Sequence, residues 1–225
     1  MRAIVMKEFG PPSVLRIADQ PEPVPGPNQV TIEVAYASVT FIETQVRAGN
    51  SPFGNPPLPR IPGNGVGGTI VATGPGVDES ILGTNVVATT GGIGSYAERA
   101  LAKLSDVVTL PKGIGIKDAV ALLADGRTAL MLFKQADIKP GERILVEAAA
   151  GGVGSLLVQL AIDCGAVVVG ASGSAQKEQV VRSLGGHYVD YSAPDWGETA
   201  RTVLRQQDGT SVSVVRDFGT TGGVS

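Results

Sequence analysis

The sequence is poor in the residues that bind metals and form disulfides. Its 225 residues include one cysteine, Cys164, and one histidine, His187. A single cysteine excludes an internal disulfide and is typical of a reducing compartment, so we expect a cytoplasmic location. A catalytic zinc ion needs three protein ligands, commonly cysteine and histidine, and a structural zinc usually needs four. We therefore predict no metal site, with Cys164 as a small core residue and His187 in a structural role.

Other absences narrow the class of protein. No stretch approaches the roughly 18 to 20 apolar residues of a membrane span. The N-terminal segment MRAIVMKEFG also lacks the apolar core of a signal peptide. A net charge of −3 provides no broad basic surface, which argues against nucleic acid as a partner. With 43% hydrophobic and 17% charged residues, the composition is that of a globular protein.

Two patterns divide the chain. Residues 1–118 alternate short β-type runs with turn-rich stretches, and the proline-dense segments 21–27 and 52–62 are expected to be loops. This part predicts a small β-barrel-like domain with strands at Ala3–Met6, Val30–Ala35, Gly68–Ala72, Asn85–Ala88, Ser95–Leu101 and Val107–Leu110. Residues 119–225 alternate helical and strand patterns, which indicates a parallel sheet with helical crossovers. The predicted fold class is therefore α/β, in two domains.

Residues 143–171 have the pattern of a strand, a glycine turn, a helix and a second strand. A short apolar run ends before Gly151, Gly152 and Gly154, and apolar residues then recur at helical spacing. Such a turn lets the backbone approach a pyrophosphate, and the helix that follows offers unpaired N–H groups and the positive end of its dipole. Ala149 takes the first place of the G-x-G-x-x-G pattern. An ordinary tight turn is the alternative interpretation.

The end of the second strand indicates which dinucleotide binds. An NAD site carries an Asp or Glu about 20 residues past the glycines, whereas an NADP site supplies hydroxyl or cationic groups instead. The segment 170–177 contains no carboxylate and offers Ser172, Ser174 and Lys177 to a 2′-phosphate. We therefore predict a preference for NADPH. In the competing interpretation, Lys177 is a solvated helix residue and the serines are helix N-caps.

The alternation continues beyond Lys177 with a helix, a strand at His187–Asp190, a helix at Trp196–Gln206 and a strand at Val212–Arg216. These strands are fewer than the six of a complete dinucleotide-binding fold. We therefore predict an incomplete Rossmann-type parallel sheet with flanking helices. Val212–Arg216 would form an open edge that can pair with another chain.

Five motifs together resemble the zinc-independent quinone oxidoreductases of the medium-chain dehydrogenase/reductase superfamily, along nearly the whole chain. They are Ala37–Gly49, Ile61–Gly68, Gly94–Glu98, Asp125–Ala129 and Ala148–Gly154. The resemblance implies a GroES-like β-barrel domain over residues 1–118, an NADP-binding Rossmann domain over residues 119–225 and a substrate cleft between them. It also implies a homodimer, although the family continues well beyond residue 225.

The same resemblance implies the functional residues. The coenzyme, NADPH, would be bound by Thr128, Ala149, Gly151, Gly152, Val153, Gly154, Ser172, Lys177 and Tyr191. The implied reaction is a metal-free hydride transfer to a quinone or another activated carbonyl or enone. Thr40 and Gln45 replace the family's asparagine and tyrosine, and we expect them to hydrogen-bond the acceptor oxygen as negative charge develops. Thr40 as an ordinary strand residue and Thr128 as a helix cap are the structural alternatives.

Two classes of function follow from these observations. The first is an NADPH-dependent oxidoreductase of the quinone reductase type. The second is a non-catalytic remnant that binds a nucleotide, or a partner protein through its open sheet edge.

Overall fold

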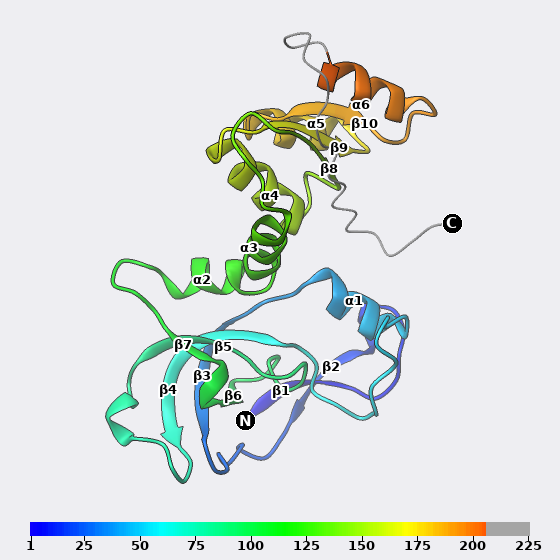
Figure 1. The fold of residues 1–225 in the computed structure, drawn as a ribbon. Coiled ribbons are helices and arrows are strands. Elements are labelled where there is room, and N and C mark those ends of the chain that lie inside the picture. Colours follow the sequence, from blue (N-terminus) through cyan, green and yellow to red (C-terminus); the bar gives the residue numbers. More distant parts are fainter. Residues whose placement is uncertain (206–225) are drawn as a thin grey trace. The chain divides into compact units, whose positions relative to one another are not determined.

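The computed structural model describes residues 1–205 and divides the chain into two compact units (Figure 1). The first unit is Met1–Ala124, and the second begins at Asp125. The expected domain boundary after residue 118 falls inside helix α2 (Ile116–Leu123), which packs on strands of the first unit. The functions assigned to the two domains stay predictions.

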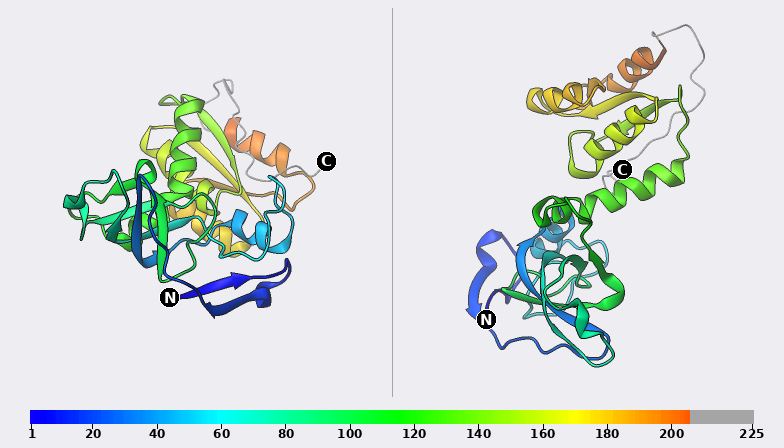
Figure 2. Two further views of the ribbon diagram at one scale, coloured as in Figure 1. Left: turned by 90° about the horizontal axis from the view of Figure 1, so that it is seen from below. Right: turned by 90° about the vertical axis from the view of Figure 1, so that its left-hand side faces the viewer.

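The first unit is built on a five-stranded antiparallel sheet that curls into a half-barrel (Figure 2). Its strand order is β6-β3-β4-β5-β7, formed by Arg99–Lys103, Gln29–Ala37, Gly65–Thr73, Asn85–Thr89 and Val107–Thr109. Alternate residues of these strands face inward, as strand geometry requires. They form one apolar core of Val30, Ile32, Val66, Ile70, Val86, Ala88, Ala100 and Ala102.

Further elements complete the first unit. Strands β1 (Arg2–Met6) and β2 (Leu15–Asp19) form an antiparallel ribbon, which single bridges join to Arg60 and Ala97. Helix α1 spans Phe41–Ala48, and α2 covers one face of β3, β4 and β5. Three short 3-10 helices lie at Pro12–Val14, Glu79–Ile81 and Leu104–Asp106.

The strand predictions for this unit are confirmed in position, with three differences. Strand β2 was not expected, because its pattern contains charged residues that this exposed ribbon tolerates. Helix α1 lies in a segment for which no helix was expected. The expected strand Ser95–Leu101 begins only at Arg99, because residues 94–98 pack as a loop against the segment around Pro62.

The second unit is a three-stranded parallel sheet in the order β10-β9-β8. Its elements are α3 (Asp125–Ala136), β8 (Arg143–Glu147), α4 (Gly152–Asp163), β9 (Val167–Ser172), α5 (Ala175–Ser183), β10 (His187–Asp190) and α6 (Trp196–Arg205). Helices α3 and α4 share one core with β8 and β9, whereas α6 packs on the opposite face through Ala200 and Leu204. Helices on both faces of a parallel sheet are the arrangement of a doubly wound fold.

The predicted α/β class, with an antiparallel barrel-like part followed by an incomplete parallel sheet, is confirmed. The predicted strand Val212–Arg216 lies outside the described residues. Within residues 1–205, no helix has the length and apolar character needed to cross a membrane.

Candidate nucleotide site and acceptor-side loops

Helix α4 begins directly after the glycine turn, at the carboxyl end of β8. Its N-cap is Gly151, which has an extended backbone and no side chain to cap the helix. The first backbone N–H groups of a helix lack partners inside the helix, and they carry the positive end of its dipole. The start of α4 therefore has the geometry and charge that suit a phosphate.

Close packing requires two of the glycines in this turn. A Cβ atom on Gly154 would lie 2.3 Å from the backbone oxygen of Ala148. A Cβ atom on Gly152 would lie 1.9 Å from Oδ2 of Asp125. The turn is also tied to the neighbouring strand, since the N–H of the fully buried Ala149 donates to Ala171 O at 3.1 Å. The glycine pattern thus holds helix α4 close to the sheet.

Asp125 is a charged residue of this site that the sequence analysis included only as part of a motif. It opens helix α3, and its carboxylate lies against Gly152 at the start of α4. A negative charge at this end of a helix is favourable by itself, but it also opposes a second anion at the same place. Thr128, which was expected to open its helix, lies three residues further into α3.

The residues predicted to select NADPH gather where β9 ends. Ser172 is the last residue of β9, only 1% exposed, and its hydroxyl has no hydrogen-bond partner among residues 1–205. Ser174 caps helix α5 by accepting from the backbone N–H of Lys177 at 3.3 Å, while the Lys177 side chain is exposed. The ring of Tyr191 packs over Gly173, where a Cβ atom would meet it at 2.9 Å. The capping interpretation is thus correct for Ser174 and does not account for Ser172.

Tyr188 of β10 strengthens the same turn. Its phenol donates to the backbone oxygen of Ser172 at 2.9 Å. Partial desolvation, followed by the negative charge of Asp190, raises the pKa of Tyr188, so the hydroxyl keeps its proton and stays a donor. At the end of β10, hydrogen bonds from Ser192 lower the pKa of Asp190. The Asp190 carboxylate therefore accepts hydrogen bonds within a turn at the end of β10, which is the strand next to β9.

The first unit brings together three of the five motifs, Ala37–Gly49, Ile61–Gly68 and Gly94–Glu98. Thr40 precedes helix α1 and forms a capping box with Glu43, whose Oε2 accepts from Thr40 N at 2.7 Å and from Thr40 Oγ1 at 3.1 Å. Glu43 Oε1 accepts from Asn64 N at 2.7 Å. The single hydroxyl proton of Thr40 therefore points to Glu43. Sequence reasoning missed Glu43, although a glutamate three residues after a threonine is a recognisable capping signal.

Tyr96 belongs to the same cluster. Gly63 has a φ of +99°, and a Cβ atom there would lie 2.6 Å from the Tyr96 ring. Burial, followed by the negative charge of Glu43, raises the pKa of the Tyr96 hydroxyl. Its oxygen is buried and has no partner at hydrogen-bond distance within the described residues, so its interaction with Glu43 is electrostatic.

The loop that carries Asn64 is tied to residues 90–95 by side-chain hydrogen bonds. Asn64 Oδ1 accepts from Gly92 N at 2.8 Å, and the Thr90 and Ser95 hydroxyls are 2.9 Å apart. Asn64 thus performs a structural role in this loop. In the described part of the chain, no group of three His, Cys, Asp or Glu side chains could hold a metal ion.

Gln45 lies one turn further along α1 and is half-buried. Its amide nitrogen donates to Thr44 Oγ1 at 3.4 Å, which leaves its second N–H for another partner. Thr40 is the N-cap of α1, with an extended backbone, whereas Gln45 lies within the helix. The two side chains form hydrogen bonds with different partners, Glu43 and Thr44.

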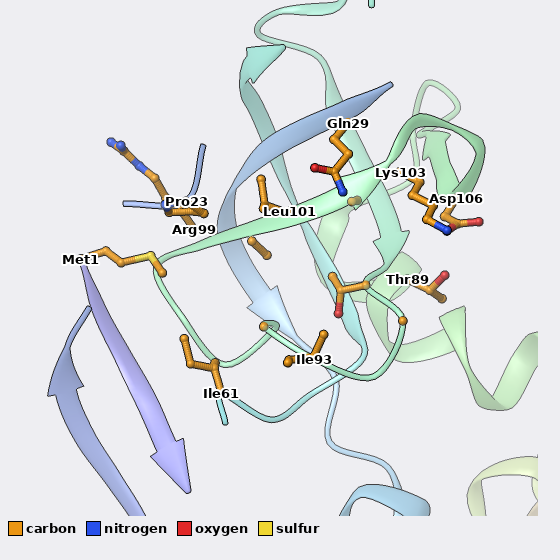
Figure 3. Close-up of a pocket in the computed structure, with 15 residues that line it drawn as sticks. Met1, Pro23, Gln29, Ile61, Thr89, Ile93, Arg99, Leu101, Lys103 and Asp106 are labelled. Atoms are coloured by element: carbon orange, nitrogen blue, oxygen red, sulfur yellow. The ribbon is translucent and has the colours of Figure 1, made fainter. Parts of the chain in front are cut away.

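The first unit also contains a pocket of about 380 Å³ beside strand β6 (Figure 3). Its lining includes Met1, Pro23, Ile61, Ile93 and Leu101. None of the predicted site residues lines it. Thr90 and Gly94 line it together with Ile61, so the pocket borders the loops that carry Asn64 and Tyr96.

The fold is an α/β arrangement of a half-barrel unit and a parallel-sheet unit, and the glycine turn of the second unit suits a phosphate. Residues 26–112 match the alcohol dehydrogenase GroES-like domain family, which confirms the expected GroES-like character of that unit. The chain is 34% identical over 218 residues to a quinone oxidoreductase of Pseudomonas aeruginosa, covering 96% of this chain and 66% of that protein. It is 31% identical over 224 residues to a 2-haloacrylate reductase of Burkholderia sp, with the same two coverages.

A solved structure agrees with these relatives. The quinone oxidoreductase of Escherichia coli, in complex with NADPH, matches with a TM-score of 0.86 and 30% identity, covering 96% of this chain and 66% of that chain. The chain therefore belongs to the quinone oxidoreductase family of the medium-chain dehydrogenase/reductase superfamily. It spans 66% of the length of these relatives.

Proposed function

We propose that the chain is the substrate-side domain and the nucleotide-binding part of an NADPH-dependent oxidoreductase that reduces quinones or other activated carbonyl and enone acceptors without a metal. The observation that carries the proposal is the end of β9, where no carboxylate stands and the buried hydroxyl of Ser172 lacks a partner in the described residues. An unpartnered buried hydroxyl loses hydration without recovering a hydrogen bond. A phosphate oxygen of NADPH would provide that bond.

The residues present fit this coenzyme. The start of α4, with Gly151, Gly152, Val153 and Gly154 after Ala149, would hold the pyrophosphate on backbone N–H groups. Ser172, Lys177 and Tyr191 would surround the 2′-phosphate, and Thr128 of α3 would orient the nicotinamide. NADPH, when bound, supplies the hydride.

On the acceptor side, Thr40 and Gln45 would lie beside the acceptor. Because the hydroxyl proton of Thr40 is donated to Glu43, the second amide N–H of Gln45 is the donor that remains for developing negative charge. Quinones and enones accept hydride readily and can take their proton from water, so the reaction needs no buried general acid. A 2-haloacrylate, the substrate in the name of the Burkholderia relative, is also an activated alkene.

We infer metal independence from the scarcity of cysteine and histidine. One cysteine and one histidine in 225 residues fall short of the three ligands that a catalytic zinc commonly takes. Activity should be unchanged after exhaustive treatment with EDTA or phenanthroline, and elemental analysis should find well under one zinc per chain. A stoichiometric zinc would overturn this part of the proposal.

Steady-state oxidation of NADPH with 1,4-benzoquinone or 9,10-phenanthrenequinone tests the function directly. Quenching of Trp196, the only tryptophan in the chain, measures coenzyme binding in parallel. We expect turnover, with NADPH bound at least about tenfold more tightly than NADH because of the charge-assisted phosphate contact. Equal affinity for the two coenzymes would overturn the assignment of NADPH. Tight NADPH binding without turnover of any acceptor would instead support a non-catalytic nucleotide-binding module.

A further inference from the structure

The carboxylate of Glu43 joins segments of the first unit that are far apart in the sequence. One oxygen accepts from both the N–H and the hydroxyl of Thr40, and the other accepts from the N–H of Asn64, 21 residues away. A third segment contributes the buried phenol of Tyr96. Its pKa is raised by burial and also by the negative charge of Glu43. The first of these segments carries Thr40 and Gln45, the residues predicted to bind the acceptor.

Among the described residues, only neutral groups donate hydrogen bonds to the Glu43 carboxylate. Within residues 1–205, no lysine or arginine forms an ion pair with Glu43, which is half-buried. A partly desolvated carboxylate without a cation is unfavourable unless hydrogen bonds satisfy its oxygens. Here each of the two oxygens is satisfied by a different segment. A neutral amide could not replace this arrangement, because it has only one oxygen.

We propose that Glu43 is a positioning residue of the acceptor site, which holds the start of α1, and with it Thr40 and Gln45, against the loop that carries Asn64. The inference rests on the proposed function, in which Gln45 donates to the acceptor oxygen. In a Glu43→Gln protein, the new amide N–H group must face the N–H of either Thr40 or Asn64. Two donors cannot pair, so the start of α1 moves away from the loop.

The first test compares Glu43→Gln with the wild type in quinone reduction at saturating NADPH. Displacing groups that orient a substrate lowers kcat/KM steeply, so we expect a loss of about tenfold or more for the acceptor. The Kd of NADPH, read from Trp196, should stay within about twofold, since its predicted ligands belong to the second unit. Glu33→Gln is the matched control, because this exposed glutamate of β3 shares none of these contacts, and its kcat/KM should equal that of the wild type.

A double-mutant cycle separates positioning from a general loss of structure. If Glu43 acts through the start of α1, then Glu43→Gln should change kcat/KM little in a protein that already carries Gln45→Leu. Fully additive losses would contradict the proposal. Glu43→Asp provides a second variant: it keeps the charge and both oxygens but shortens the reach, so its kcat/KM should lie between those of Glu43→Gln and the wild type.

Amide hydrogen exchange gives a measurement that does not depend on activity. Glu43→Gln should accelerate exchange at Thr40 and Asn64 while leaving the Ser38 amide, which donates to Gly65 O at 2.9 Å, unchanged. An active protein whose kcat/KM is unaffected by Glu43→Gln overturns the positioning role and leaves the proposed function standing. A wild type that reduces no acceptor overturns the proposed function, and amide exchange still decides whether Glu43 joins the two segments.

Discussion

The nucleotide turn and the acceptor-side loops are built in different ways. The turn around Gly151 to Gly154 connects β8 directly to α4, so its residues are neighbours in the chain and their role follows from short-range geometry. The acceptor-side loops depend instead on one carboxylate, Glu43, that bonds Thr40 nearby and Asn64 far away. A site formed by a single strand–turn–helix connection can be recognised in the sequence as a motif. A site made from several loops depends on contacts between distant segments, and no single motif shows which segments meet.

The largest expected effect tests the short-range region. Gly154→Ala puts a Cβ atom 2.3 Å from a backbone oxygen, so the turn must open or α4 must shift. We expect the free energy of unfolding to fall by about 1–3 kcal/mol and NADPH binding to weaken strongly. The control is Gly197→Ala in α6, where a Cβ atom meets nothing within 4 Å. That substitution should stabilise the protein slightly in the same denaturant titration. A Gly154→Ala protein of unchanged stability would contradict the packing argument.

The next effect is on coenzyme affinity alone and is expected at Lys177, whose position also follows from the local sequence. Lys177→Ala should weaken NADPH by roughly 1.5–3 kcal/mol, the value of a charge-assisted contact, and leave NADH nearly unchanged. Trp196 quenching measures both affinities. Lys134→Ala, at an exposed lysine in the last turn of α3, controls for loss of positive charge in the same unit. Equal weakening of both coenzymes would show that Lys177 does not contact the 2′-phosphate.

Asp125 belongs to helix α3, yet its side chain packs against the glycine turn that begins α4. Its carboxylate lies against Gly152 and opposes an incoming pyrophosphate. Asp125→Asn should therefore tighten NADPH by about 0.5–1 kcal/mol at low ionic strength, and added salt should reduce the gain. Asp163→Asn, at the other end of α4, should show no such gain. A weaker binding of NADPH by Asp125→Asn would mean that this carboxylate supports the coenzyme instead.

The smallest expected effect is on acid stability, and it contrasts a local with a long-range carboxylate. Hydrogen bonds from Ser192 lower the pKa of Asp190, and hydrogen bonds from Arg2, 96 residues away, lower the pKa of Glu98. A carboxylate whose pKa is lower in the folded state stabilises the protein above its unfolded pKa, near 4, and loses this contribution as the pH falls through the folded value.

Melting temperature measured from pH 7 down to pH 2 should therefore decline less steeply for Asp190→Asn and for Glu98→Gln than for the wild type. Because Glu98 joins the N-terminal strand to the half-barrel, its substitution should also lower the melting temperature at pH 7 more than Asp190→Asn does. Identical pH profiles for all three proteins would contradict the assignment of these pKa shifts.

Much of the fold was predictable from local patterns. The period of apolar residues indicated β3, β4, β5, β8, β9 and β10, since a strand or helix that buries one face must repeat its apolar residues at a fixed spacing. Helix α1 was missed, and none of its residues is buried. The start of β6 was misplaced, because Tyr96 is held by Gly63 and the loop around it and not by strand pairing.

The sequence by itself determined the class of the protein, the strand–turn–helix that begins α4 and the missing carboxylate at the end of β9. These features depend on residues close together in the chain, and local sterics and backbone hydrogen bonding dictate them. Only the tertiary structure decided that Glu43 joins Thr40 to Asn64, that Asp125 lies against Gly152 and that Tyr191 covers Gly173. Such contacts form between segments that packing brings together, and no periodicity within either segment encodes the partner.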